Sequence, residues 1–360
     1  MVHFLTRLIF CLFAEDVGLL PKGLFSELVR FTLERPGRFG SQMLALFEAM
    51  RDGGDFALKP IARFNGSLFE EVDVVELTPA EIEVVAEAAA LDWANIEPAI
   101  FGTLFERGLD PSKRAQLGAH YTSRDDILLI VEPVVLAPLR REWDEVRAQA
   151  DALVAAWWQA KDAGVRTRRR NELQRLLFGF QERLAAVTVL DPACGSGNFL
   201  YVALSRLKDL EKELITYAAT VGQLPLFLPR VSPRQLKGIE VNTYAHDLAQ
   251  IVVWIGYLQW MTANGFQVSR EPVLERMESV VQMDAILDLS DPEHPKEPAW
   301  PAAEFIIGNP PFLGGKRLRT ELGDAYVNAL FKVYEGRVPH EADLCCYWFE
   351  KARQQIAAGK

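Results

Sequence analysis

Four short apolar runs in the second half of the chain constrain its fold more than any other feature. They are Val187 to Leu190, Leu236 to Ile239, Ser279 to Val281 and Phe305 to Ile307. Each run ends in a polar turn, and the helix-length segments Phe199 to Ala219 and Ala245 to Ala263 separate the first three. This alternation is typical of a parallel sheet built from strand–helix–strand units, so we predict an α/β fold. Residues 221–233 and the proline-rich residues 288–301 should be excursions outside that sheet.

The chain before these runs is predicted to be helical. Residues 1–110 should form a helical domain, in which Phe4 to Phe13 and Met43 to Met50 place apolar residues three and four apart. Thr78, Pro79 and Glu81 form a capping box ahead of an alanine-rich helix that we extend from Glu81 to Trp93.

A second helical block, residues 133–186, precedes the first predicted strand. Apolar residues keep the helical spacing from Leu136 to Trp157 and again from about Asn171 to Ala186. We expect the two helices to pack as a hairpin about a turn near Gly164. This hairpin and the sheet over residues 187–360 would make up a second domain, residues 111–360.

Composition narrows the class of protein. With 49% hydrophobic and 24% charged residues among 360, the chain can bury a substantial core. The cysteines, at positions 11, 194, 345 and 346, show no C-x-x-C spacing and no histidine partners, so we expect neither disulfides nor a metal site.

The hydropathy and charge of the chain indicate whether it could bind a membrane or nucleic acid. One apolar run, Leu8 to Phe13, could be taken for a signal peptide. It is followed by Glu15 and Asp16 and has no small-residue cleavage site after it. We therefore expect a buried helix there, a cytoplasmic protein and no membrane partner. Because the net charge is −10, nucleic acid could bind only through a local basic surface.

The segment from Val189 to Phe199 carries the strongest chemical signal. A strand ending in Asp191 enters a turn in which Gly195 and Gly197 lack the side chains that would keep a ligand from the backbone, and a helix begins near Asn198. A dinucleotide site would favour a third glycine where Leu200 stands, and a phosphate-binding loop would need Gly-Lys-Ser/Thr, which is absent. The turn therefore favours a nucleoside-like ligand of another kind.

Polar residues also end the next three predicted strands. Glu240 follows the second strand, where it could accept hydrogen bonds from ribose hydroxyls, and Asp284 follows the third. The fourth runs into Asn309, Pro310, Pro311 and Phe312. The Asn309 side-chain oxygen and the Pro310 carbonyl can accept the two hydrogens of an exocyclic amine, the prolines stiffen the loop, and Phe312 offers a stacking face.

These motifs together resemble those of the gamma-class N6-adenine DNA methyltransferases. Asp-Pro-Ala-Cys-Gly-Ser-Gly at 191–197, the acidic strand end and Asn-Pro-Pro-Phe at 309–312 look like that family's S-adenosylmethionine and catalytic motifs. The segment 118–123, Gly-Ala-His-Tyr-Thr-Ser, is similar to the segment that closes over the methionine end of the cofactor, and its position ahead of the cofactor motif is the gamma order. The leader Phe4 to Asp16 and residues 307–315 look closest to the MmeI-like fused restriction-modification enzymes.

The resemblance covers nearly all of the chain and implies a fold and an activity. The fold would be a helical N-terminal region followed by a class I S-adenosylmethionine-dependent methyltransferase domain with a Rossmann-like parallel sheet. The activity would be site-specific transfer of a methyl group from S-adenosylmethionine to the N6 amine of an adenine flipped out of duplex DNA, in a restriction-modification or phage-defence system.

It also implies roles for individual residues. Glu240 would bind the ribose, Asp284 the adenine amine of the cofactor, and Asn309, Pro310, Pro311 and Phe312 the target base. The full cofactor-binding set would be Tyr121, Thr122, Asp191, Pro192, Ala193, Cys194, Gly195, Gly197, Asn198, Phe199, Glu240 and Asp284.

Two basic clusters are candidates for contact with duplex DNA. Lys316, Arg317 and Arg319 follow the Asn-Pro-Pro-Phe loop closely enough to grip phosphate beside the flipped base. The second cluster lies in the helical hairpin, where we slightly favour a solvated helix face over contact with DNA. Its members are Arg166, Arg168, Arg169, Arg170, Arg175 and Arg183.

The sequence also departs from the family. It stops at Lys360, just after a helix predicted from about Ala342 to Ala357, where the family's sheet continues and a target-recognition domain follows. We therefore expect a truncated chain that lacks a target-recognition domain or subunit, leaves an unpaired sheet edge and has no nuclease activity.

Other functions remain open at this stage. The same chemistry could act on the N4 amine of cytosine or on a protein glutamine, although the glutamine enzymes are short and lack a long helical leader. A cofactor-binding but inactive module that recognises DNA or a partner is the third alternative. The DNA recognition sequence and the oligomeric state leave no trace in the sequence.

Overall fold

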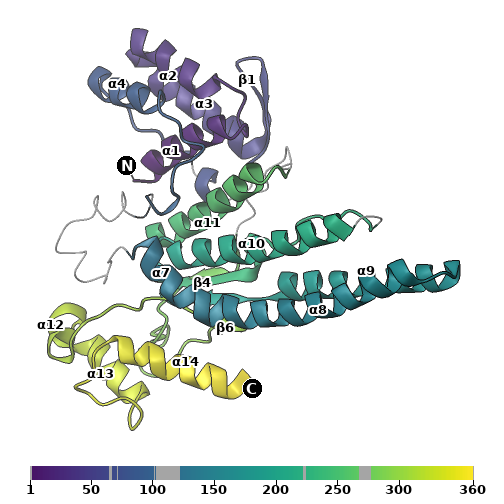
Figure 1. Ribbon diagram of the computed structural model, residues 1–360. Helices are drawn as coiled ribbons and strands as arrows, with labels where there is room; N and C mark the ends of the chain where they lie inside the picture. Colours follow the sequence, from purple (N-terminus) through teal and green to yellow (C-terminus); the bar gives the residue numbers. More distant parts are fainter. Residues whose placement is uncertain are drawn as a thin grey trace. The chain divides into compact units, whose positions relative to one another are not determined.

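The computed structural model of the chain describes residues 2–64, 67–70, 72–100, 102, 122–221, 224–266 and 277–359 (Figure 1). It divides into two compact units, Met1–Phe101 with Asp247–Glu278, and Gly102–His246 with Ser279–Lys360. The domain boundary predicted at residue 110 stays a prediction, because it falls outside the described residues. The assignment of residues 247–278 to the first unit was not predicted from the sequence.

The first unit is mainly helical, as the sequence predicts. Its core is aromatic, with Phe10 packed edge-on against Phe64 and Phe69 at ring-centroid distances of 5.6 and 5.8 Å. Its elements are α1 (Val2–Asp16), α2 (Leu24–Glu34), η1 (Pro36–Arg38), α3 (Phe39–Asp52), β1 (Gly54–Phe56), β2 (Lys59–Ile61), η2 (Ser67–Phe69), α4 (Pro79–Ala88) and the part of α11 (Thr243–Ala263) from residue 247 onward.

Two details of this unit correct the sequence analysis. The predicted capping box is present, with the Thr78 side chain accepting from Glu81 N–H, but the helix it begins ends at Ala88 rather than at Trp93. The Trp93 indole donates to the Ala88 carbonyl at 2.7 Å and so satisfies the end of the helix. The antiparallel hairpin of β1 and β2 was not predicted.

The second unit contains a four-stranded parallel sheet with the order β5–β4–β3–β6. All four predicted strands are confirmed, with ends shifted by at most two residues. The elements are α7 (Arg124–Val131), the π-helix η3 (Glu132–Leu136), α8 (Ala137–Gln159), α9 (Ala163–Ala186), β3 (Val189–Asp191), α10 (Asn198–Val221), η4 (Pro233–Gln235), β4 (Leu236–Glu240), β5 (Val280–Gln282), β6 (Phe305–Ile306), η5 (Gly315–Arg317), α12 (Leu318–Leu322), α13 (Asp324–Val333) and α14 (Cys345–Gly359).

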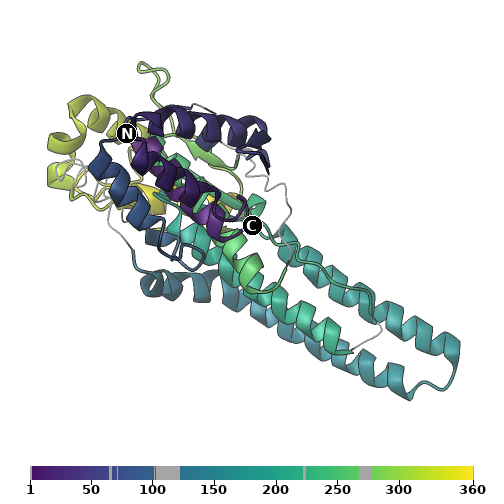
Figure 2. The same ribbon diagram turned by 90° about the horizontal axis from the view of Figure 1, so that it is seen from above.

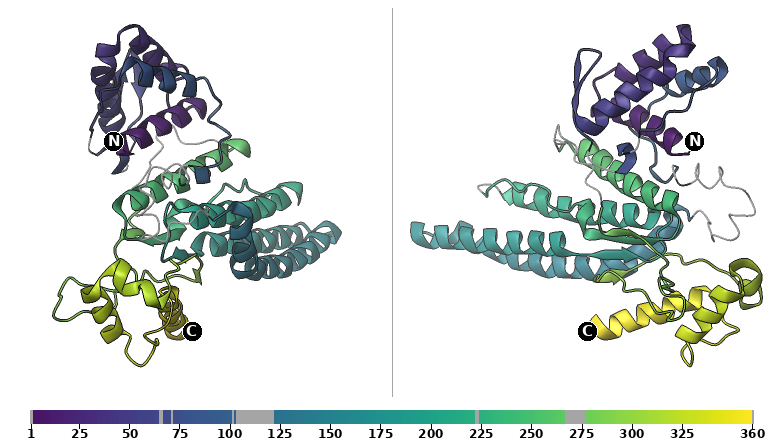
Figure 3. Two further views of the ribbon diagram at one scale, coloured as in Figure 1. Left: turned by 90° about the vertical axis from the view of Figure 1, so that its left-hand side faces the viewer. Right: turned by 180° about the vertical axis from the view of Figure 1, so that it is seen from behind.

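Helices cover both faces of this sheet (Figure 3). On one face α10 packs against β3, β4 and α9. On the other face Leu190 and Ile239 pack with Trp300 from the proline-rich excursion and with Trp348 of α14. The sheet is therefore buried between two layers, which explains why its strands are short continuous apolar runs.

The predicted helical hairpin is present and extends beyond the sheet as α8 and α9 (Figures 1 and 2). Its second helix begins at Ala163, not near Asn171, because the Asp162 side chain caps Val165 N–H at 2.8 Å. Gly164 thus lies within the helix, and the turn falls at residues 160–162. The tip of the hairpin lies at the opposite end of the unit from α12 and α13 (Figures 1–3).

A buried charged cluster anchors the first excursion. Lys208 and Glu211 of α10 are fully buried, with Nζ and Oε2 3.8 Å apart. The Lys208 ammonium donates to the Val231 carbonyl at 3.0 Å, while the Glu211 carboxylate accepts from Val231 N–H. Two charges in an apolar helix are tolerated there because the excursion supplies their hydrogen bonds.

The described helices include none that is both long enough and apolar enough to cross a bilayer.

Candidate functional site

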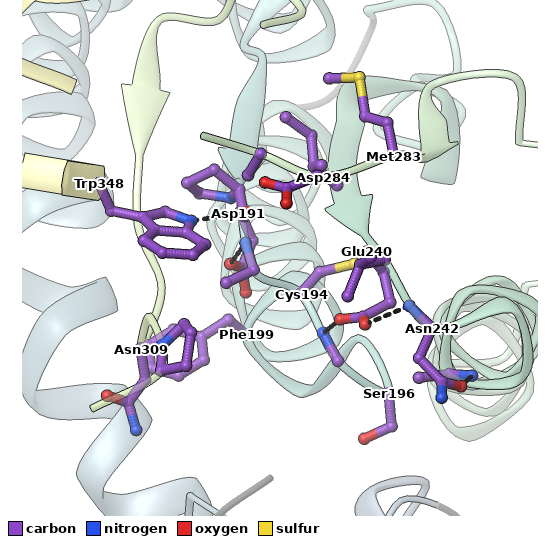
Figure 4. A pocket seen from close by; sticks show the side chains of 18 of the residues that line it. Asp191, Cys194, Ser196, Phe199, Glu240, Asn242, Met283, Asp284, Asn309 and Trp348 are labelled. Atoms are coloured by element: carbon purple, nitrogen blue, oxygen red, sulfur yellow. Dashed lines mark hydrogen bonds between the residues drawn. The ribbon is translucent and has the colours of Figure 1, made fainter. Parts of the chain in front are cut away.

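A pocket opens where the carboxyl ends of the four parallel strands meet (Figure 4). The chain runs outward from β3 to β5 and then returns to place β6 on the other side of β3. Connections diverge at such a switch point, so a crevice forms there. Its lining includes all four strand ends singled out from the sequence, namely Asp191, Glu240, Asp284 and Asn309. The pocket encloses about 1220 Å³ of empty space, part of it open to solvent.

Asp191 ends β3 at the base of the pocket and is only 1% exposed. Its Oδ1 accepts from Ala193 N–H at 3.0 Å. Burial raises the pKa of Asp191 to about 7, because this one hydrogen bond opposes desolvation only in part and the Glu240 carboxylate adds repulsion. Gly308, at φ +153°, brings the end of β6 so close that a Cβ there would overlap Asp191 Oδ1.

The turn after Asp191 needs its two glycines. Gly195 and Gly197 have φ of +51° and +84°, in the left-handed region. Gly197 does not line the pocket; its N–H donates to the Cys194 carbonyl at 2.8 Å and shapes the turn. Asn198 then begins α10, and its Oδ1 is buried without a hydrogen-bond partner among the described residues.

Glu240 ends β4 and is held by backbone donors on both sides (Figure 4). Its Oε2 accepts from Gly195 N–H at 2.9 Å and its Oε1 from Asn242 N–H at 2.8 Å. Burial raises the pKa of Glu240 above its usual value, and these backbone hydrogen bonds oppose the rise. The carboxylate is therefore fixed in place before any ligand arrives.

Asp284 follows β5 and is fixed in the same manner. Its Oδ1 accepts from the backbone N–H groups of Ile286 and Leu287, at 2.8 and 3.1 Å. Its Oδ2 accepts from the Tyr326 hydroxyl of α13 at 2.6 Å.

Asn309 is held more loosely than the three carboxylates. It is exposed, and its Nδ2 donates to the Thr122 hydroxyl at 3.2 Å, which leaves its Oδ1 as an acceptor. Pro311 lines the pocket, whereas Pro310 and Phe312 do not, and Phe312 is 61% exposed.

The remaining residues of the predicted cofactor set differ in whether the structure places them at the pocket. Most of them line the pocket, as Thr122, Pro192, Ala193, Cys194, Asn198 and Phe199 do. Tyr121 lies outside the described residues. Among the described residues, no group of three His, Cys, Asp or Glu side chains is placed to hold a metal ion.

Sequence reasoning missed several lining residues. Met283 directly precedes Asp284 and Asn242 lies two residues after Glu240, so both could have been found by extending the strand-end argument by one or two positions. Tyr326 and Trp348 come from helices far along the chain, and no local pattern marks them. The Trp348 indole donates to the Pro192 carbonyl at 2.9 Å, which ties α14 to the turn after β3.

Comparison with known proteins agrees with this geometry. The family model described as "MmeI, DNA-methyltransferase domain" matches residues 166–360, which is more than half of the chain. The chain belongs to the MmeI DNA-methyltransferase family. A second model, "MmeI, helicase spacer domain", matches residues 1–69. The MmeI-like resemblance drawn from the sequence is thus confirmed, as is the class I methyltransferase fold.

Individual relatives give the extent of the match. The chain is 28% identical to DNA methyltransferase A of Bacillus subtilis (strain 168), over 96% of this chain and 37% of that protein. It is also similar to the type IIL restriction-modification enzyme MmeI, whose structure was solved in complex with DNA, with 28% identity and a TM-score of 0.77. That match covers 99% of this chain and 45% of the MmeI chain, so the chain spans less than half the length of these relatives.

Basic residues near the pocket of this MmeI-like chain are partly neutralised. Arg317 pairs with Glu321 at 2.6 Å, and Arg319 pairs with Asp324 at 2.8 Å. Lys316 is exposed and forms no ion pair with a described residue.

The hairpin cluster is also less basic than its sequence indicates. Arg169 pairs with Glu172, and Arg183 bridges Glu142 and Glu304. Since the hairpin tip lies away from α12 and α13, which border the pocket, a solvated helix face is the simpler interpretation of its arginines (Figure 1).

Proposed function

We propose that this MmeI-like chain carries the S-adenosylmethionine site and the target-adenine site of a DNA N6-adenine methyltransferase of the restriction-modification type. The observation that carries the proposal is the meeting of Asp191, Glu240, Asp284 and Asn309 in one pocket at the switch point of a parallel sheet.

The residues present fit the cofactor by their chemistry. The pocket offers several acceptors, namely three carboxylates and the buried Asn198 Oδ1, which has no hydrogen-bond partner among the described residues. S-adenosylmethionine offers donors that these acceptors can bind, namely an ammonium, two ribose hydroxyls and an exocyclic amine, and it carries a positive sulfonium. A buried acceptor without a partner is costly, so Asn198 Oδ1 supports a ligand donor nearby.

Each acceptor has a proposed partner. A carboxylate has about four lone-pair sites, so Glu240 can accept from ribose hydroxyls while it keeps its two backbone donors. Asp284 would accept from the adenine amine. Thr122, Asp191 and Asn198 would surround the methionine end, with the glycine turn allowing close approach to the backbone.

The target half of the site would hold the base and its amine. When bound, S-adenosylmethionine supplies an electrophilic methyl group. Asn309 Oδ1 and the Pro310 carbonyl would accept the two amine hydrogens, and Thr122 would orient the Asn309 amide by accepting from its Nδ2. Phe312, being exposed, would stack on a base that has left the duplex, and Lys316, Arg317 and Arg319 would contact the DNA backbone beside it.

A methyl-transfer assay tests this function. The chain is incubated with tritium-labelled S-adenosylmethionine and unmethylated duplex DNA, and the products are digested and separated as nucleosides. We expect label in N6-methyladenine. Asn309→Ala should lower the rate at least about 100-fold, the scale of a lost transition-state acceptor, and leave cofactor affinity within about twofold.

Asn171→Ala, on the exposed surface of α9, is the matched control and should behave as the unchanged chain. Label in N4-methylcytosine or in protein glutamine would move the activity to another amine. Cofactor binding without any transfer would leave a DNA- or partner-binding module, and an absence of cofactor binding would overturn the proposal.

A further inference from the structure

Among the described residues that line the pocket, Asp284 and Tyr326 form the shortest hydrogen bond made by a side chain. The phenol oxygen lies 2.6 Å from Asp284 Oδ2, and both residues line the pocket. Because the backbone N–H groups of Ile286 and Leu287 hold Oδ1, the carboxylate is restrained from two sides. Its plane is therefore set by Tyr326 of α13 as well as by the backbone of the segment after β5.

The Tyr326 hydroxyl acts as a donor in this contact. Burial and the neighbouring Asp284 charge both raise the pKa of Tyr326, so the phenol keeps its proton at any physiological pH. An ionised carboxylate can only accept, which leaves the phenol as the donor.

Helix α13 is fixed to the segment after β5, so Tyr326 cannot drift away from Asp284. Val327 and Leu330 pack with Ile286 and Leu287 in one buried cluster. Tyr334, two turns further along, donates from its hydroxyl to the Ile286 carbonyl at 2.9 Å. Two tyrosines of one helix segment thus bind the same loop, but only Tyr326 lines the pocket.

We propose that Tyr326 is a specificity-determining positioning residue, which holds Asp284 as an oriented acceptor so that the pocket selects a purine with an exocyclic amine over one with a carbonyl. The inference rests on the proposed function, since it assumes that the adenine of S-adenosylmethionine lies beside Asp284. A carbonyl at that position would place acceptor against acceptor, and the mismatch is costly only while the carboxylate cannot turn away.

Two ligands that differ at this one group provide the test. Affinities for S-adenosylhomocysteine and for S-inosylhomocysteine, in which a carbonyl replaces the amine, are measured by calorimetry for the unchanged chain, Tyr326→Phe and Tyr334→Phe. The unchanged chain should prefer the adenosine ligand. Tyr326→Phe should weaken that ligand about tenfold, leave the inosine ligand nearly unchanged and so reduce the preference about tenfold, as the loss of a hydrogen bond to a charged group predicts.

Tyr334→Phe is the matched control. It removes a hydroxyl from the same loop contact but not from the pocket, so it should lower the melting temperature and keep the preference. Each preference is a ratio within one protein, so a variant that is partly unfolded still gives a valid comparison.

The outcomes distinguish a failure of this inference from a failure of the proposed function on which it rests. If the unchanged chain binds neither ligand, the proposed function fails. If it binds and discriminates but Tyr326→Phe keeps the full preference, or weakens both ligands equally, Tyr326 only supports the structure and the inference is overturned.

Discussion

The two halves of the pocket differ in how firmly hydrogen bonds hold their side chains and in how exposed those side chains are. In the half proposed for the cofactor, Asp191, Glu240 and Asp284 are each restrained by one to three hydrogen bonds from the protein. In the half proposed for the target base, Asn309 has one side-chain hydrogen bond to the described residues, at 3.2 Å, and Phe312 is 61% exposed. A small ligand needs a site formed in advance, whereas a macromolecular substrate brings groups that complete its own site. The proposed function accounts for both.

The halves are nevertheless joined by short connections. Gly308 lies against Asp191, and the Thr122 hydroxyl holds Asn309. Behind the loop, Leu344 N–H donates to the Leu313 carbonyl at 2.9 Å, so the segment before α14 supports the chain that follows β6. The exposed loop is therefore anchored at both ends while its middle stays open.

Two phenylalanines, one from each half, give the largest expected contrast. Phe199 is 5% exposed, so Phe199→Ala should cost about 3–5 kcal/mol of unfolding free energy. Phe312→Ala should change stability by less than about 0.5 kcal/mol because the ring is exposed, yet lower methyl transfer about tenfold to 100-fold through lost base stacking. Chemical denaturation and the transfer assay measure the two effects. A large stability loss in Phe312→Ala would show that the target half is as closed as the cofactor half.

Asp191 gives the next contrast, through pH. Its folded pKa of about 7 lies above the ordinary aspartate value, so between about pH 4 and pH 7 the folded state holds a proton that the unfolded state has released. Stability contributed by this group is present at low pH and is lost as pH rises through that window. Asp191→Asn removes the titration, so its unfolding free energy relative to the unchanged chain should rise by on the order of 3 kcal/mol from pH 4.5 to pH 7.5.

Denaturant titrations across that pH range measure the difference. Asn309→Ala serves as the comparison from the open half, because it removes no ionisable group and should show a constant difference. A flat profile for Asp191→Asn would mean that Asp191 is solvated in the folded protein, and the contrast between the halves would then lose its electrostatic part.

Much of the cofactor half could be predicted from the sequence because its signals are local. A short apolar run that ends in Asp191 and two glycines specifies strand, turn and helix within a dozen residues, and the later strand ends follow the same rule. Parallel strands place their carboxyl ends at one edge, so the chain order was enough to bring Glu240, Asp284 and Asn309 together.

Other features could not be predicted from the sequence, and each has a physical reason. Tyr326 and Trp348 enter the pocket through packing between helices, which no sequence period reports. The turn between β1 and β2 uses Ala57 and Leu58 at φ +49° and +63°, where glycine or asparagine would have marked it. The first two turns of α9 are arginine-rich and lack the apolar spacing that predicts a helix, so its start was placed too late. The final helix begins at Cys345 rather than near Ala342, and the residues just before it bond to the loop after β6, with Leu344 N–H donating to the Leu313 carbonyl and Gly315 N–H to Asp343 Oδ1.

The smallest expected effect concerns the DNA backbone. Arg317 and Arg319 already pair with Glu321 and Asp324, so a phosphate must compete with a carboxylate for each of them. Lys316 has no such competitor among the described residues. Each phosphate contact contributes about 0.9 to the slope of log affinity against log salt concentration. Lys316→Ala should therefore lower the slope for duplex DNA by about 0.9, and adding Arg317→Ala and Arg319→Ala should lower it by less than the further 1.8 or so that two free contacts would give.

Salt titrations of DNA binding for these variants decide the matter. Lys161→Ala is the control and should leave the slope unchanged, because Lys161 lies in the turn between α8 and α9. The tip of this hairpin lies away from α12 and α13 (Figure 2). An unchanged slope in the triple variant would remove this loop from the DNA interface. A full loss near 2.7 would mean instead that DNA displaces both carboxylates, and hence that the open half of the pocket rearranges when its substrate binds.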